Sequence, residues 1–156
     1  MDIWEIFRNY YQYFLRGTVT TVIVSLITVL FGFILGCVIA LLRMSKSKLL
    51  STFGKLYITV LRGTPLLVQL YIVYYQLDFI PYPKVMVLGI ALERALPCAI
   101  ALSLNSAAYV AEIIRSGIQA VDFGQTEAAY SIGMTKAQTM LHIVMPQAIK
   151  NILPAI

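Results

Sequence analysis

The sequence predicts an all-α protein whose helices cross a membrane several times. Of its 156 residues, 60% are hydrophobic and only 12% are charged, whereas about 25% of the residues in an ordinary soluble domain are charged. The charges are also unevenly placed, because long apolar stretches alternate with short polar segments. One helical span needs about 20 mostly apolar residues, so the chain has room for three or four spans.

The composition excludes several classes of function. The net charge of +5 is spread thinly, without the basic run or aromatic-interleaved patch that is typical of nucleic-acid binding. Cys37 and Cys98 lie far apart in apolar stretches, where they suit the role of small packing residues, and His142 is the sole histidine. The residues therefore predict no metal site, no catalytic nucleophile, no cofactor and no enzymatic activity, and the sequence lacks the GxxxxGKS or GxxxxGKT loop that binds nucleotides.

The first 42 residues predict a surface helix followed by a first membrane span. Over residues 1–16, aromatic and aliphatic side chains recur at helical spacing opposite polar ones, as expected of an amphipathic helix in the membrane interface. Residues 17–42 carry no charge and are long enough, as a helix, to cross the hydrocarbon core. Within them Gly32, Gly36 and Ala40 repeat every four residues. This spacing predicts a face that a second helix can approach closely, although chance placement of glycines remains the alternative.

A kinked second span is predicted next. Apolar residues mark one face of an amphipathic helix from Leu49 to Leu61, and the pattern then breaks at Arg62. Thr64 can cap a new helix and Pro65 can occupy its first position. A span is therefore expected from about residue 64 to residue 78, with no charge from Leu66 to Leu77.

The rest of the chain predicts a loop, a third span and a polar segment. Residues 78–94 suit an outer loop in which the apolar run Val85 to Leu92 forms an interfacial turn of helix. Residues 95–114 form the third predicted span, and residues 115–150 are the most polar part of the sequence. Residues 149–156 turn apolar again, which we interpret as the start of a fourth span that is cut off.

The distribution of lysine and arginine predicts the orientation. Segments 43–55 and 115–150 together hold seven of these residues, whereas segments 1–16 and 78–94 hold four. Positive charge is enriched in the cytoplasmic loops of membrane proteins. The N-terminus is therefore expected outside and residues 115–150 in the cytoplasm.

One short stretch of the cytoplasmic segment is predicted to be a helix with a docking surface. Thr126 suits a cap, Glu127 suits the first turn, and Gly133 suits a left-handed residue that ends the helix. The adjacent Ala128 and Ala129 leave a low surface against which a partner can pack. A connecting helix without a partner remains the alternative on this pattern alone.

The same stretch resembles the EAA signature of the membrane permeases of bacterial ATP-binding-cassette importers. After Glu127-Ala128-Ala129, the residues Gly133, Ile143 and Pro146 follow at the spacing of that signature. Met145 stands where the signature usually has leucine, which is a change that conserves volume. The resemblance therefore rests on a spaced set of residues and not on a bare Glu-Ala-Ala.

Flanking segments resemble the polar amino acid uptake subfamily of these permeases. They are Arg62-Gly63-Thr64-Pro65-Leu66-Leu67-Val68-Gln69, Ala108 to Arg115, Gly124-Gln125 and Pro146-Gln147-Ala148. The whole resemblance covers about residues 10–156. It implies a MetI-like permease fold, and because members of the family continue through two further membrane helices, it also implies a chain that stops after its third span.

Two groups of residues are candidates for function, one implied by the resemblance and the other suggested by the residues themselves. The coupling helix, which would sit in a groove of the ATPase subunit, takes Glu127, Ala128, Ala129, Gly133, Ile143 and Pro146, with Pro146 starting the next span. The residues themselves suggest a substrate pathway at the kink, because a helix that restarts inside the membrane points its positive end into the cavity. That group is Arg62, Thr64, Pro65, Gln69, Asn105 and Tyr109. A kink used only for packing remains the alternative, and Glu112 with Arg115 is expected to form an ion pair.

The predicted function is that of the permease subunit of an amino acid importer in the bacterial inner membrane. The implied partners are an ABC ATPase subunit, an extracytoplasmic solute-binding protein, a second permease subunit, membrane lipid and the amino acid substrate, with no nucleic acid. A secondary transporter or channel is a rival, although the spans carry almost no ionisable residue that could relay ions. A membrane-anchored interaction module without transport is the other rival.

Overall fold

The computed structural model describes residues 3–76, 83–87 and 90–155, and most of them are helical. The long helices are α1 (Ile3–Arg43), α2 (Lys48–Gly63) and α4 (Leu92–Gln119), and the short α3 (Leu66–Tyr71) runs into a π-helical turn at Ile72–Gln76. At the far end lie α5 (Phe123–Ser131), α6 (Lys136–Thr139) and α7 (Met145–Ile152), with a π-helical turn at Met140–Val144 and a 3-10 turn at Leu153–Ala155. The predicted all-α class is confirmed.

Two of these helices, α1 and α4, are by length and composition able to cross a membrane. Helix α2 is too short to pass this test alone and passes it only together with the segment Leu66–Gln76, from which it is separated by a bend of 103°. The predicted kink in the second span is therefore confirmed. Its local chemistry differs from expectation: Thr64 lies at the C-terminal end of α2 and Pro65 is the N-cap of α3, whose first helical residue is Leu66.

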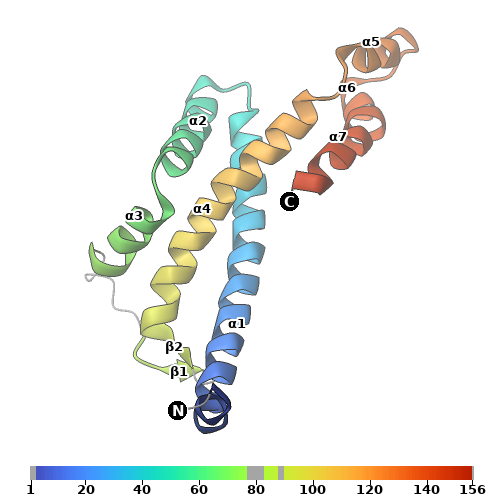
Figure 1. Cartoon of the computed structure of the whole chain (residues 1–156). Coiled ribbons are helices and arrows are strands. Elements are labelled where there is room, and N and C mark those ends of the chain that lie inside the picture. The colour runs from blue at the N-terminus through green and yellow to red at the C-terminus, as the bar shows by residue number, and fades with distance from the viewer. Residues whose placement is uncertain (1–2, 77–82, 88–89, 156) are drawn as a thin grey trace.

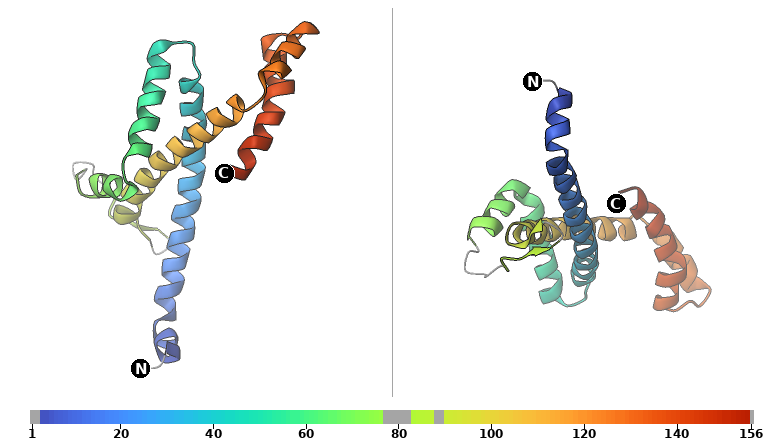
Figure 2. Two further views of the ribbon diagram at one scale, coloured as in Figure 1. Left: turned by 45° about the horizontal axis from the view of Figure 1, so that its top comes forward. Right: turned by 90° about the horizontal axis from the view of Figure 1, so that it is seen from below.

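Helices α1 and α4 form the central contact of the molecule and lie side by side along much of their length (Figures 1 and 2). A Cβ atom on Gly32 would lie 2.8 Å from Ser106 Cβ, and one on Gly36 would lie 2.7 Å from Val110 Cβ. Ala40, on the same face, is 1% exposed. The predicted small-residue face is therefore confirmed, and α4 is the helix that it receives.

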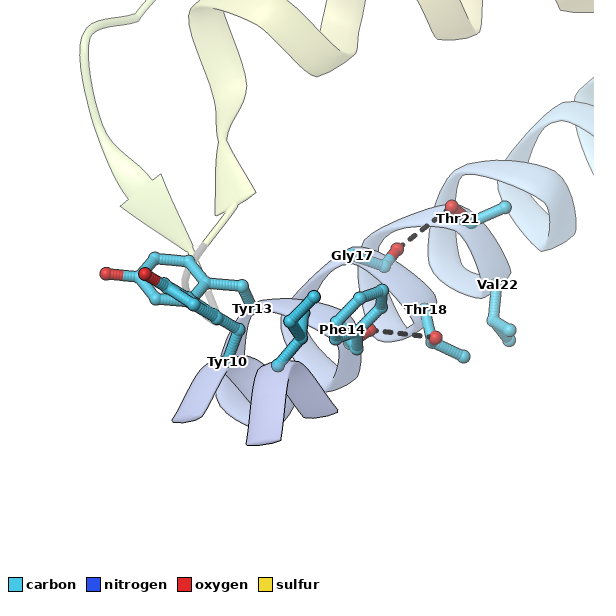
Figure 3. Close-up of a pocket in the computed structure, with 8 residues that line it drawn as sticks. Tyr10, Tyr13, Phe14, Gly17, Thr18, Thr21 and Val22 are labelled. Atoms are coloured by element: carbon cyan, nitrogen blue, oxygen red, sulfur yellow. Dashed lines mark hydrogen bonds between the residues drawn. The ribbon is translucent and has the colours of Figure 1, made fainter. Parts of the chain in front are cut away.

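The N-terminal region differs from the prediction of a separate surface helix, because residues 1–16 and 17–42 share the single helix α1. The threonines near Gly17 do not break it. The hydroxyls of Thr18 and Thr21 donate to the carbonyl oxygens of Phe14 and Gly17, each at 2.9 Å (Figure 3), so these side chains add to the helical hydrogen bonds. Placement of the first 16 residues in the membrane interface stays a prediction.

The segment before α4 also differs from expectation. Within the run Val85 to Leu92, the described residues form two short strands, β1 (Met86–Val87) and β2 (Ile90–Ala91), which pair antiparallel in place of the expected turn of helix. Its β-branched residues favour extended backbone, and the Leu92 amide donates to the Val85 carbonyl at 3.1 Å to close it. The parts of the predicted loop at 78–82 and 88–89 lie outside the described residues.

Helix α4 exceeds the predicted span of 95–114 at both ends, since it begins at Leu92 and ends at Gln119. Glu93 lies in its first turn, where a carboxylate stabilises a helix. At the other end Arg115 donates to Glu112 and to Gln119, so the charged residues bond within the helix and do not interrupt it. The C-terminal ends of α1 and α4 and the N-terminal end of α2 lie toward the same end of the molecule (Figure 1).

Candidate functional site

The predicted coupling helix forms, but it begins earlier than expected. Helix α5 starts at Phe123, and Asp122 is its N-cap: the Asp122 Oδ1 atom accepts from the Gly124 amide at 2.6 Å. The expectation that Thr126 caps this helix is wrong, because an aspartate that already satisfies the first free amides stands four residues earlier. Glu127 consequently lies in the middle of α5 and is exposed.

Gly133 ends this region as predicted. Its φ angle is +84°, a left-handed conformation that glycine adopts without strain. Just beyond it, Thr135 and Gln138 form a reciprocal cap at the start of α6. The backbone N–H of Gln138 donates to Thr135 Oγ1 at 3.4 Å, and the backbone N–H of Thr135 donates to Gln138 Oε1 at 2.8 Å. The chain therefore turns sharply between two helices whose ends are both defined.

The two alanines of the signature have different environments. Ala128 is exposed, whereas Ala129 is only 3% exposed and is the buried residue of α5, which packs against α6 and the following π-helical turn. The expectation that both alanines present a low surface is therefore wrong for Ala129. The exposed apolar residues at this end of the molecule are Phe123, Tyr130, Ile132 and Leu141.

Ile143 and Pro146 lie on a continuous helical run that joins α6 to α7. The expectation that Pro146 starts a helix is confirmed, because Pro146 lies in the first turn of α7; that α7 begins a membrane span stays a prediction. The π-helical turn leads into α7 without a break: the Met145 amide donates to the Met140 carbonyl five residues back, and proline at the next position needs no such partner. Helix α7 then packs on α4, where Gly117 leaves room for Ile152 and the Gly117 carbonyl accepts from Asn151 at 3.4 Å.

The bend between α2 and α3 is held by a buried amide. Gln69 Nε2 donates to the Leu61 carbonyl at 2.8 Å and to Thr64 Oγ1 at 2.7 Å, and Gln69 Oε1 accepts from Asn105 Nδ2 at 3.0 Å. Asn105 also donates to the Leu61 carbonyl at 3.2 Å. The cluster thus satisfies the carbonyls that the break leaves free and ties the bend to α4.

The exposed Arg62 side chain lies next to the same bend. The Arg62 guanidinium stands 5.2 Å from the centre of the Tyr109 ring, and its Nη1 atom is 4.0 Å from Glu112 Oε1. Glu112 pairs with Arg115, whose Nε atom donates to Oε2 at 3.0 Å, so the predicted ion pair is confirmed. The structure therefore divides the predicted pathway residues: Arg62, Thr64, Pro65 and Tyr109 are exposed, whereas Gln69 is buried and Asn105 half-buried.

Other surfaces are less suited to polar chemistry. A hollow of about 650 Å³ runs along the exposed N-terminal half of α1, where Tyr10, Tyr13 and Phe14 lie beside Thr18 and Thr21 (Figure 3). Residues within the described ranges do not bring three histidine, cysteine or acidic side chains together as metal ligands. One interhelical contact escaped the sequence analysis, since Tyr57 on α2 donates to the Leu104 carbonyl on α4 at 2.8 Å. Its signal, a tyrosine within an apolar face, is not specific.

Curated proteins with sequences similar to this chain are named as transport system permeases. Among curated relatives, a Rickettsia felis protein named for a glutamine transport system permease, GlnP, is 40% identical, and the arginine transport system permease protein ArtQ of Bacillus subtilis is 41% identical. Each match covers 92% of this chain and 63% of the relative, so the chain spans less than two thirds of their length.

A solved structure, described as the crystal structure of an amino acid ABC transporter with histidines, is 43% identical with a TM-score of 0.86. The match covers 99% of this chain and 68% of that one, which confirms the expected MetI-like permease fold for this part. Residues 29–156 match a family model described as the binding-protein-dependent transport system inner membrane component. The chain therefore belongs to the family of binding-protein-dependent transport system inner membrane components.

Proposed function

We propose that this chain is part of the permease subunit of an ATP-binding-cassette importer for amino acids. The observation that carries the proposal is the fold of the EAA segment. Its two short helices α5 and α6, called the α5–α6 cap below, lie at one end of the long helices (Figure 1). Relatives named for glutamine and arginine transport support amino acids as the substrate class. Such a subunit forms a path and transmits movement, without covalent chemistry and without a cofactor.

Coupling to an ATPase subunit is proposed for the exposed side of α5. Glu127 and Ala128 are exposed there and offer a charge beside a flat surface, and Gly133 turns the chain back without a side chain in the way. Movement of α5 would pass through Ile143 and Pro146 into α7. From α7 it would reach α4 at Gly117, where the two helices touch. Ala129 serves this path by holding α5 against its neighbours.

The substrate path is proposed to run past the bend between α2 and α3. Arg62, Thr64, Pro65 and Tyr109 are exposed there, so a carboxylate or amide of a passing substrate could reach them. Gln69 and Asn105 are occupied by hydrogen bonds to one another and to backbone oxygens, which assigns them to positioning the bend. The proposed partners are the ABC ATPase subunit, an extracytoplasmic solute-binding protein and a second permease subunit. The apolar exposed surface of α1 suits a neighbouring helix or lipid.

Uptake by the complete permease tests the function. Reconstituted with its ATPase and binding protein, the permease should take up a radiolabelled amino acid only when ATP is enclosed, and vanadate should abolish uptake. Tyr109→Ala should raise the KM for the binding-protein complex by about fivefold, because an exposed aromatic contact of this kind contributes about 1 kcal/mol. Uptake that follows an ion gradient without ATP would contradict the proposal and favour a secondary transporter. Absence of all uptake, with ATPase binding retained, would favour an interaction module.

The orientation is proposed with the α5–α6 cap in the cytoplasm and strands β1 and β2 outside, on the count of lysine and arginine. Single cysteines at Thr135 and Val85, both exposed, provide the test in a background without Cys37 and Cys98. An impermeant maleimide added to intact cells should label the Val85 position, whereas the Thr135 position should react only after the membrane is opened. The reverse labelling would overturn the orientation and the coupling role together.

A further inference from the structure

A cavity of about 240 Å³ lies between α1, α2 and α4 and is lined largely by basic side chains. Arg43 comes from the end of α1, Lys55 and Arg62 come from α2, and Arg115 comes from α4. Glu112 is the one acidic residue among the lining side chains. Four cations against one carboxylate leave an excess of three positive charges around the cavity, so it favours an anion.

The internal contacts of the cavity use only part of this charge. Glu112 is occupied by Arg115 and is 4.0 Å from Arg62. Arg43 Nη1 donates to the neutral Ser51 hydroxyl at 3.3 Å, which leaves the charge of Arg43 uncompensated. Within the described ranges, Lys55 forms no hydrogen bond and no ion pair through its side chain. Arg43 and Lys55 therefore line the cavity without a carboxylate partner.

A second stripe on α2 indicates what kind of anion fits. Lys55, Thr59 and Arg62 follow one another at helical spacing on the cavity side. About a third of a turn around the same helix, four apolar residues are exposed at the matching spacing. They are Leu49, Phe53, Leu56 and Val60, of which Leu49 is 80% exposed. An apolar stripe beside a basic cavity suits a ligand that has both an acyl chain and an anionic group.

The place of the cavity in the fold agrees with such a ligand. It opens beside the end of α1 and the C-terminal part of α4, the two helices that are able to span a membrane. A spanning helix meets the layer of lipid phosphates near its ends, and basic pockets between membrane helices bind anionic head groups there. A free anion would gain the charge but would leave the apolar stripe uncovered.

We propose that this cavity is a binding site for the phosphate of an anionic phospholipid, whose acyl chains lie along the apolar stripe of α2. The phosphate is held by Arg43 and Lys55, and Arg62 and Arg115 complete the positive lining of the cavity. The proposal does not depend on the transport function. It requires only a chain embedded in a bilayer.

Native mass spectrometry of the full chain in neutral detergent tests the proposal. Dioleoyl phosphatidylglycerol and dioleoyl phosphatidylcholine carry the same acyl chains, so a preference between them reports the head group alone. The chain should bind phosphatidylglycerol more tightly. Lys55→Gln should weaken that binding by about fivefold, and Arg43→Gln together with Lys55→Gln by about 25-fold, because each basic residue near a membrane surface contributes about 1 kcal/mol.

The matched control removes charge from the same end of the molecule but outside the cavity. Lys46 and Lys48 lie in and just after the loop between α1 and α2 and do not line the cavity. Lys46→Gln with Lys48→Gln should leave the preference for phosphatidylglycerol within twofold, and circular dichroism should show all variants to be equally helical. An equal loss in this control would overturn a defined site in favour of general surface charge. Equal binding of both lipids, or full displacement of phosphatidylglycerol by millimolar inorganic phosphate, would overturn the lipid as the ligand.

Discussion

Replacing Gly36 with leucine is expected to separate α1 from α4 and to destabilise the whole helical unit. The added Cβ atom alone would lie 2.7 Å from Val110 Cβ and 3.1 Å from the Ala107 carbonyl oxygen. Backbone cannot yield as a flexible side chain does, so the cost should reach or exceed the usual range for overpacking, about 1–3 kcal/mol. The variant should unfold at a lower temperature in detergent and show aggregates in size-exclusion chromatography.

Gly17→Leu is the matched control, since it makes the same change on the same helix. A Cβ atom at Gly17 meets no atom within 4 Å among the described residues. This variant should retain the parent's unfolding temperature and elution profile. Equal stability of the two leucine variants would show that the contact between α1 and α4 is looser than the structure has it.

Replacing Ala129 with aspartate should unfold α5 and its contact with α6. The same change at Ala128 should leave α5 folded and block only its proposed docking to the ATPase subunit. Ala129 is buried within the cap, and a carboxylate there would have no partner to offset its lost hydration, which costs several kcal/mol. Ala128 is exposed, so the new charge stays in water. Limited proteolysis should therefore cleave near α5 in the Ala129→Asp variant and spare the Ala128→Asp variant.

The two variants should also differ in how they fail functionally. In the complete permease assembled with its ATPase, Ala128→Asp should lower substrate-stimulated ATP hydrolysis by about tenfold, within the usual range of coupling between sites. Membrane insertion should be unchanged, since α1 and α4 are untouched. Ala128→Ser is the conservative control and should retain most of the stimulation. Stimulation at the parent level in Ala128→Asp would show that the exposed side of α5 does not face the ATPase.

Most of the fold could be predicted because a bilayer constrains the backbone strongly. Runs without charge must be helices where lipid surrounds them, so the positions of α1 and α4 follow from composition. The glycine spacing at Gly32 and Gly36 even identified the face of α1 that packs. Element boundaries were harder to predict, because capping depends on local competition. Asp122 satisfied the first amides of α5 before Thr126 could, and the sequence offers both.

The environments of the site residues could not be predicted from spacing alone. Positions 128 and 129 are both alanine, so the residue type does not distinguish them. The packing of α6 against α5 decides which of the two is buried. Gln69 is similar: a polar residue after a proline suggests a pathway, yet its amide is consumed by Leu61, Thr64 and Asn105. Hydrogen bonds between residues far apart in the chain carry no periodic signal.

The contact between α1 and α4 has a mechanical consequence. Two helices normally slide past one another on a layer of side chains, but at Gly32 and Gly36 that layer is missing and the backbones lie against their neighbour. The two helices should therefore move as one rigid unit. A force applied to α4 at Gly117 would tilt this unit without sliding α1 past α4. The bend of 103° between α2 and α3 is tied to α4 through the Asn105 side chain, so it would move together with α4.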